Sequence, residues 1–186
     1  PIRYNGTTLK QGETITGENG GTATVDSKNN TITLDNFKGN YPLEFNAEFT
    51  PNSIIHIGDS TLSAVETKYQ NLTISGSGSL TVGSIQVHNQ KASFDDQTIN
   101  GATVTVGTAE LTTRAIDIDG DLTVTNGSLT ATSTSDNVPT VQVGGNASFT
   151  GSTVTITNHS TTQGERYKDS NAASSALHVN GAVTIS

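Results

Sequence analysis

Three carboxylates fall within five residues in the segment Asp117-Ile-Asp-Gly-Asp121. In an extended strand, side chains two residues apart point to the same face, so Asp117 and Asp119 are expected to share a face, with Asp121 just past the Gly120 turn. Carboxylate oxygens are ligands that calcium prefers. Asp117, Asp119 and Asp121 are therefore candidate ligands of a calcium ion, the one cofactor that the sequence suggests. The alternative interpretation is that these Asp residues only cap a turn.

A wider group of polar side chains occurs at matching positions of four similar triplets, Ile85-Gln-Val, Ile116-Asp-Ile, Val141-Gln-Val and Leu177-His-Val. The alternation of apolar and polar residues predicts strands with one buried and one outward face. The candidate ligand-binding residues on this outward face, which form a polar strip, are Gln86, His88, Asp117, Asp119, Gln142, His178 and Asn180. Arg166 and Tyr167, from the segment that precedes the last triplet, are expected at its rim. A face that is merely solvated would explain the same pattern.

Catalysis has less support in the sequence. A polysaccharide lyase would need an Arg or Lys beside acidic residues to remove a proton, and Arg114 or the Arg166/Lys168 pair are the candidates. None of them lies in a patterned motif. The four histidines, His56, His88, His159 and His178, are dispersed, and each is expected to face solvent. A glycosidase pair at Asp117 and Asp119 stays open as an alternative, but the sequence favours a protein that is not an enzyme.

The elements that must position these residues follow a recurring three-strand unit. One example is Ile116-Asp-Ile, Leu122-Thr-Val and Leu129-Thr-Ala, with Gly, Asn or Asp turns between the strands. Another begins at Ile85, with Ala92-Ser-Phe and Val104-Thr-Val as its next strands. A chain that returns to the same unit is typical of a solenoid. We therefore predict an all-β fold, a right-handed parallel β-helix with three strands per coil and about six coils.

Hydroxyl side chains dominate the other two outward faces of the predicted coil. The third strands carry Thr31, Thr33, Ser79, Thr81, Thr103, Thr105, Ser128, Thr130, Thr153 and Thr155. The second strands carry Thr73, Ser93, Thr123, Ser148 and Thr184. Thr is the ordinary exposed residue of a strand. An ice-binding surface, which would order water on such a ladder, is a weaker alternative.

Composition agrees with one thin-cored domain over residues 1–186, since only 31% of the residues are hydrophobic and 19 are Gly. Residues 1–22 are a candidate N-terminal cap, and residues 157–175 form a long loop insertion. The chain is interpreted as a fragment of a larger surface protein, with flanking domains of the same chain as partners. No membrane insertion of this fragment is expected, because no apolar run is long enough. The net charge of −8, with nine Lys and Arg, argues against nucleic-acid binding.

Three stretches carry a resemblance to a known group of proteins: Tyr4-Asn-Gly-Thr-Thr, the run from Thr22 to Asn36, and Leu72-Thr-Ile-Ser-Gly-Ser-Gly-Ser-Leu-Thr-Val. They resemble repetitive right-handed β-helical, carbohydrate-binding-type domains of exported Gram-positive bacterial surface proteins, which are similar to pectate lyases. The resemblance implies an extracellular location, at the bacterial cell surface or secreted, and a ligand among acidic sugars, bound with calcium. Its motifs are structural repeats, so it carries over no site residue.

The expected function is thus a non-catalytic adhesin module that binds a polysaccharide, a host glycan or host matrix, with calcium assisting if the ligand is acidic. The alternative is a structural stalk with no ligand of its own. About six coils at ~4.8 Å each would span roughly 30 Å, which suits a spacer. Aromatic residues make up 5% of the chain and none is Trp. Binding would therefore depend on hydrogen bonds and would be weak unless multivalent.

Overall fold

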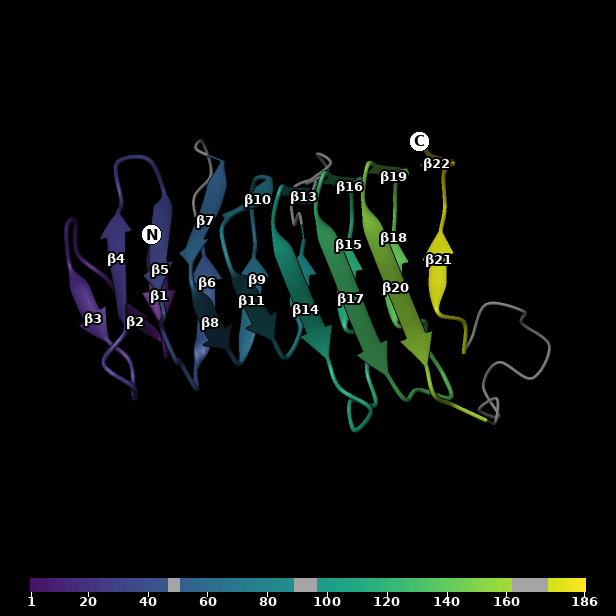
Figure 1. Cartoon of the computed structure of the whole chain (residues 1–186), viewed down its shortest axis with the longest axis horizontal. Helices are drawn as coiled ribbons and strands as arrows, with labels where there is room; N and C mark the ends of the chain where they lie inside the picture. The colour runs from purple at the N-terminus through teal and green to yellow at the C-terminus, as the bar shows by residue number, and fades with distance from the viewer. Residues whose placement is uncertain (47–50, 89–96, 162–173) are drawn as a thin grey trace.

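The computed structural model describes residues 1–46, 51–88, 97–161 and 174–186 (Figure 1). All regular structure in these ranges is β-strand, and no helix occurs among them. None of the described residues therefore forms a helix long and apolar enough to cross a membrane. Alternating Thr, Val and Ile favour strands because β-branched side chains suit a pleated, half-buried surface.

The strands form three sheets, in which hydrogen-bonded neighbours follow one another in a fixed spatial order. In that order, sheet A contains β2 (Thr7–Thr8), β1 (Ile2–Tyr4), β6 (Pro42–Phe45), β9 (Ala64–Thr67), β12 (Ile85–Val87), β15 (Ile116–Ile118), β18 (Val141–Val143) and β21 (Leu177–Val179). Sheet B contains β22 (Val183–Ile185), β19 (Ala147–Thr150), β16 (Leu122–Thr125), β13 (Gln97–Asn100), β10 (Leu72–Gly76), β7 (Asn52–Ile57), β5 (Thr31–Asp35), β4 (Thr22–Asp26) and β3 (Thr14–Thr16). Sheet C contains β20 (Thr153–Asn158), β17 (Ser128–Ser133), β14 (Thr103–Gly107), β11 (Ser79–Val82) and β8 (Asp59–Leu62).

From β7 onward, consecutive strands lie in sheets B, C and A in turn, and each strand pairs in parallel with the strand three further along the chain. The register is continuous. In sheet B, Ile74 pairs with Ile54 on one side and with Ile99 on the other. Figure 1 shows the strands following one another along the long axis, from the purple N-terminal end to the yellow C-terminal end. Equivalent residues of successive strands are thereby brought into columns.

The core is a single apolar cluster to which all three sheets contribute inward side chains. In sheet C, Leu80, Val104 and Leu129 stack in register and are each at most 1% exposed. Strands bury alternate residues, as in the buried–intermediate alternation of β16 and β17. Burial of these aliphatic side chains is the main favourable contribution to folding, and it leaves the intervening polar residues on the outside.

The two ends of the sheets differ. At the N-terminal end, β1 pairs antiparallel with β2 and β6, and β4 pairs antiparallel with β3 and β5. Most of these strands lie within or next to residues 1–22, the predicted cap. At the other end, the side chains of Val183 and Ile185 are 49% and 78% exposed. Most of the 157–175 insertion, from residue 162 to 173, lies outside the described residues.

Tight turns join sheet B to sheet C. Gly78, between β10 and β11, has a φ of +78°, and a Cβ atom built on it would lie 2.1 Å from the Gly58 carbonyl oxygen of the preceding turn. Gly101, between β13 and β14, has a similar φ of +66°, but a Cβ there would meet nothing within 4 Å. Both positions favour glycine by conformation, and only Gly78 also requires it for space.

Two strand assignments made from sequence are wrong. The strand between β10 and β16 is Gln97–Asn100, whereas Ala92-Ser-Phe, with Ser93, lies outside the described residues. Thr98 therefore occupies the outward position predicted for Ser93. Thr31 and Thr33 belong to sheet B, where they pair with Ser53 and Ile55 of β7, and not with the hydroxyl column of sheet C. The apolar–polar pattern marks strands but does not say which sheet an early strand joins.

His56 is fully buried, whereas the sequence predicts that it faces solvent. It lies on β7 at the alternate position after Ile54, so it points inward with the core residues of that strand. Its Nδ1 atom is 3.0 Å from the Ser77 carbonyl oxygen, and its Nε2 atom has no hydrogen-bond partner among the described residues. Burial lowers the pKa of His56, and the hydrogen bond to Ser77 opposes that shift in part.

Candidate functional site

The polar strip lies on the outward face of sheet A, where four of its side chains stand in one column. Parallel pairing places Gln86 opposite Asp117, Asp117 opposite Gln142, and Gln142 opposite His178. The flanking apolar residues of each triplet, such as Ile116 and Ile118, point into the core. Because strands in a sheet are about 4.8 Å apart, the column repeats a polar side chain at that interval.

A second column follows just past the strand ends. The backbone ladder continues there, because the amides of His88, Asp119, Gly144 and Asn180 donate to the carbonyls of Thr67, Val87, Ile118 and Val143 respectively. Gly144 interrupts the side chains of this column. A Cβ atom at Gly144 would lie 2.2 Å from the Asp119 carbonyl oxygen, so the backbone is bare between Asp119 and Asn180.

His88 joins the two columns. Its Nδ1 atom lies 3.2 Å from Oδ1 of Asp119, and its Nε2 atom lies 3.9 Å from Oδ2 of Asp117. Burial raises the pKa of Asp117, while His88 and Arg114 lower it and the charge of Asp119 raises it further. Burial is the largest of these effects, because it disfavours the ionised form of a carboxyl group. This part of the strip therefore brings two carboxyl groups and an imidazole together in a partly buried setting.

Two further polar pairs lie beyond this charged group. Nε of Arg114 donates a hydrogen bond of 2.6 Å to Oε1 of Gln142. Nε2 of His178 lies 2.9 Å from Oδ1 of Asn180. Arg114 comes from the connection between β14 and β15, and its hydrogen bond holds the guanidinium against the strip. The strip thus has a charged half around Asp117 and a half of amide and imidazole groups around Gln142 and His178.

Asp121 does not belong to the strip. Its Oδ1 atom accepts a 2.7 Å hydrogen bond from the backbone amide of Asn146, and Oδ1 of Asn146 accepts in turn from the amide of Ala182. Asp121 therefore ties together the turns that join sheet A to sheet B. This outcome matches the alternative that Asp caps a turn.

The predicted calcium ligands are consequently not gathered at one point. Within the described ranges, no group of three or more His, Cys, Asp or Glu side chains is placed to hold a metal ion. Asp117 and Asp119 face His88, and Asp121 is held by Asn146. These residues do not fit a calcium site. Arg166 and Tyr167, predicted at the rim, lie outside the described residues.

The column also extends to residues that the sequence-based set omitted. Glu66 pairs with Gln86 and with Glu44, and Glu44 pairs with Arg3 of the antiparallel strand β1. The sequence signal for Glu66 is incomplete, because only one of its two buried neighbours, Val65, is apolar, whereas the other, Thr67, is polar. These two carboxylates lengthen the charged half of the outward face of sheet A toward the N-terminal end.

No protein-family model matches the chain, and neither a curated protein nor a solved structure matches it. The case for a function therefore depends on the geometry of the polar strip and on the chemistry of its side chains.

Proposed function

We propose that this chain is a right-handed parallel β-helix module of an exported bacterial surface protein, and that it binds a linear carbohydrate along the polar strip without catalysis. The parallel pairing of each strand with the strand three further along supports the β-helix. The right-handed sense is the usual one for crossovers between parallel strands. The resemblance of its repeats to β-helical domains of exported Gram-positive proteins agrees with this assignment.

The observation that carries the proposal is the register of Gln86, Asp117, Gln142 and His178 in one outward column. A ligand with a regular chemical repeat can make the same kind of hydrogen bond to each successive strand. Carboxylates accept hydrogen bonds from sugar hydroxyls, and the Gln and Asn amides both donate and accept. The central column of sheet C offers only hydroxyls, at Thr61, Thr81, Thr105, Thr130 and Thr155.

The geometry of the charged half favours binding over catalysis. His88 lies between Asp117 and Asp119 and contacts both, so the two carboxylates are engaged with an imidazole on the surface of a sheet. Individual hydrogen bonds at such an exposed face are weak. Affinity is expected to come from several strands acting on one polymer, or from several modules acting together.

A stalk without a ligand is the competing function. The continuous core and the regular columns of sheets B and C are what a spacer needs. The two functions differ in one respect: a spacer tolerates replacement of the outward side chains of the polar strip, because no ligand has to contact them.

The test is a glycan array that includes neutral and acidic polysaccharides and host-matrix glycans, run on the 186-residue chain with calcium and again with a chelator. The variants are Asp117→Asn with Asp119→Asn, and Gln142→Leu. The matched controls are Glu110→Gln, an exposed carboxylate on the loop after β14, and Thr105→Ser on sheet C. Loss of one hydrogen bond to a charged group corresponds to roughly a tenfold or greater loss of affinity.

Binding that the strip variants weaken and the controls leave unchanged supports the proposal. Equal binding with calcium and with the chelator is expected, because the carboxylates do not form a calcium site. A blank array under both conditions would favour the stalk, and binding that survives all the strip variants would remove the site from sheet A.

A further inference from the structure

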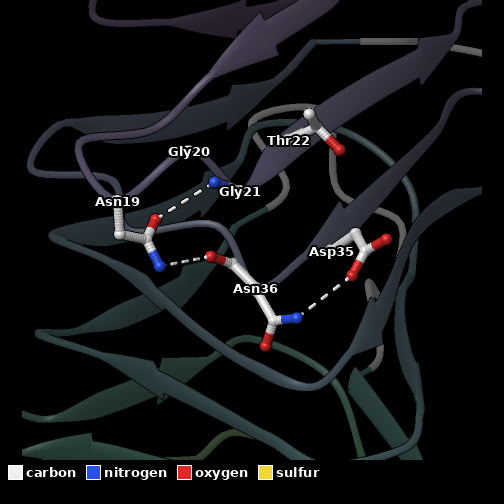
Figure 2. Close-up of a pocket in the computed structure, with 6 residues that line it drawn as sticks. All are labelled: Asn19, Gly20, Gly21, Thr22, Asp35 and Asn36. Carbon is white, nitrogen blue, oxygen red and sulfur yellow. Dashed lines mark hydrogen bonds between the residues drawn. The ribbon is translucent and has the colours of Figure 1, made fainter.

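A separate pocket of about 370 Å³ lies at the N-terminal end of sheet B, on the outside of the molecule (Figure 2). It is bounded by the turn between β3 and β4 and by the end of β5. Six residues line it: Asn19, Gly20, Gly21, Thr22, Asp35 and Asn36. None belongs to the polar strip. Its volume lies within the range of pockets that hold small ligands, about 300–1,000 Å³.

Hydrogen bonds fix one wall of this pocket. The Nδ2 atom of Asn19 donates to the Asn36 carbonyl at 2.9 Å, and Oδ1 of Asn19 accepts from the Gly21 amide at 3.3 Å. The Asn36 side chain is held as well, since its Oδ1 accepts from the Asp59 amide at 3.2 Å. A Cβ atom on Gly21 would lie 1.9 Å from the Asn36 carbonyl oxygen. Glycine at this position therefore lets the turn close onto the end of β5.

The turn is also tied to the segment after β5. The amide of Glu18 donates to the Lys38 carbonyl at 3.2 Å, and its carboxylate accepts from the side chain of Asn40. Hydrogen bonds within the protein therefore hold this wall of the pocket in place. Preorganised walls reduce the entropic cost of binding.

The opposite wall presents groups with hydrogen-bonding capacity to spare. Thr22 and Asp35 are directly paired on the antiparallel strands β4 and β5, where Asp35 is exposed and Thr22 is partly exposed. The one hydrogen bond to the Asp35 carboxylate within the described part of the chain is a long one of 3.4 Å from Asn36. An ionised carboxylate offers about four acceptor sites, so most of those of Asp35 are available.

An apolar side chain lies next to Asp35 on the neighbouring strand, although it is not one of the six residues that line the pocket. Ile57 of β7 pairs with Asp35 in the parallel register, and it is 46% exposed, which is unusual for an aliphatic residue in this protein. Three neighbouring strands therefore present a hydroxyl, a carboxylate and a methyl-rich side chain next to one another, from Thr22, Asp35 and Ile57. A sugar ring has the complementary chemistry, because it carries hydroxyls on its edge and C–H groups on its face.

We propose that this pocket binds one neutral pyranose unit, with Asp35 and Thr22 hydrogen-bonded to its hydroxyls and with the ring extending past Asp35, so that its C–H face meets Ile57 on β7. The site is independent of the polar strip, because it lies on another sheet and shares no residue with it. If the ligand of the strip is a polymer, this pocket is a second contact point and not a continuation of the first.

The experiment is a ¹H–¹⁵N NMR titration of the 186-residue chain with methyl glycosides of glucose, galactose, mannose and N-acetylglucosamine. Saturable shifts are expected at the Gly20 and Gly21 amides and at the Asn19 side-chain amide. Asp35→Asn and Thr22→Val should weaken binding about tenfold each, which is the loss of one good hydrogen bond. Glu110→Gln serves as the matched control and should bind as the parent chain does.

The same spectra separate this proposal from the proposed function. Shifts at the side-chain amides of Gln142 and Asn180 report the polar strip, whereas shifts at Asn19, Gly20 and Gly21 report the pocket. The absence of saturable shifts at the pocket with all four sugars would overturn the proposal. Equal binding by the Asp35→Asn and Thr22→Val variants would also overturn it, as would stronger binding of methylammonium than of every sugar, which would indicate a cation site.

Discussion

The Nδ1 atom of His88 lies 3.2 Å from Oδ1 of Asp119, although the two residues are separated by a whole set of three strands in the chain. The parallel register of β12 and β15 brings them together, and it places Asp117 on the other side of the same imidazole. A charged group of this kind, on the outside of a sheet, has consequences for stability as well as for binding.

Asp117→Asn is expected to raise the free energy of unfolding slightly at pH 7, by less than about 1 kcal/mol. Burial raises the pKa of Asp117, so the folded state disfavours its ionised form. Below the ordinary Asp pKa of 3.8 the carboxyl group is protonated in both states and does not destabilise the fold. The destabilisation develops as the pH rises through the higher pKa of the folded state. Urea unfolding at pH 7 and at pH 3 measures the effect, and the difference from the parent should shrink at pH 3. A loss of more than about 1 kcal/mol at pH 7, with Glu110→Gln unchanged, would mean that the contact with His88 dominates.

Stability should fall as pH decreases below about 6.5, the ordinary value for His, because of His56. Burial lowers the pKa of His56 in the folded state, so the unfolded chain binds more protons between that lowered pKa and 6.5. The decrease should level off once the pH is below the folded pKa. Urea unfolding at pH 7.5 and 5.5 measures the slope, and His56→Leu should reduce it whereas His159→Gln, at an exposed site, should not.

An NMR titration of the His56 ring gives an independent check that does not depend on the variant folding. Its midpoint should lie below 6.5. A midpoint at or above that value, or an unchanged slope in His56→Leu, would contradict the role assigned to burial.

Gly78→Ala should destabilise the protein more than Gly101→Ala does. Both glycines have positive φ, so both substitutions carry a conformational cost of about 1–2 kcal/mol. Only at Gly78 does the added methyl group overlap a backbone oxygen of the preceding turn, and relieving such overpacking costs roughly another 1–3 kcal/mol. Denaturant midpoints for the two variants, measured side by side, isolate the steric contribution. Equal losses would show that the turns are free to move apart.

Leu80→Ala should cost about 2–5 kcal/mol, because Leu80 is fully buried between two strands of sheet C. Ile185→Ala should change the free energy of unfolding by no more than about 0.5 kcal/mol, since that side chain is 78% exposed. Urea unfolding of both variants provides the comparison. A large loss in Ile185→Ala would indicate that Ile185 is covered in solution.

The sequence was sufficient to predict the column of Gln86, Asp117, Gln142 and His178. Each of these residues lies between two apolar residues that belong to the core or pack against it, and a slip of one position would turn that pair outward. The same rule could have placed His56, which alternates with Ile54 and Asn52. The usual preference of His for exposed or partly exposed sites predicts the opposite, but the alternation of the strand decides the position of His56.

Other features depend on turn geometry, and apolar periodicity does not encode it. Asp121 follows Gly120 at the point where the chain leaves sheet A, and its carboxylate meets the Asn146 amide of the next turn. Gln97 begins a strand with a buried amide that has no hydrogen-bond partner within the described ranges. Apolar periodicity therefore does not indicate this strand and instead favours Ala92-Ser-Phe. The pocket beside Asp35 depends on the turn at Gly20 and Gly21, which carries no strand pattern at all.

The bare backbone at Gly144 separates the charged half of the polar strip, with Asp117 and Asp119, from the half that holds His178 and Asn180. The two halves are chemically different, and they are fixed in sequence order along the sheet. A linear ligand that lies across them has a direction, as a glycan does between its reducing and non-reducing ends. Its two possible orientations on the strip are therefore inequivalent, and a chain bound here would be aligned by the protein as well as held by it.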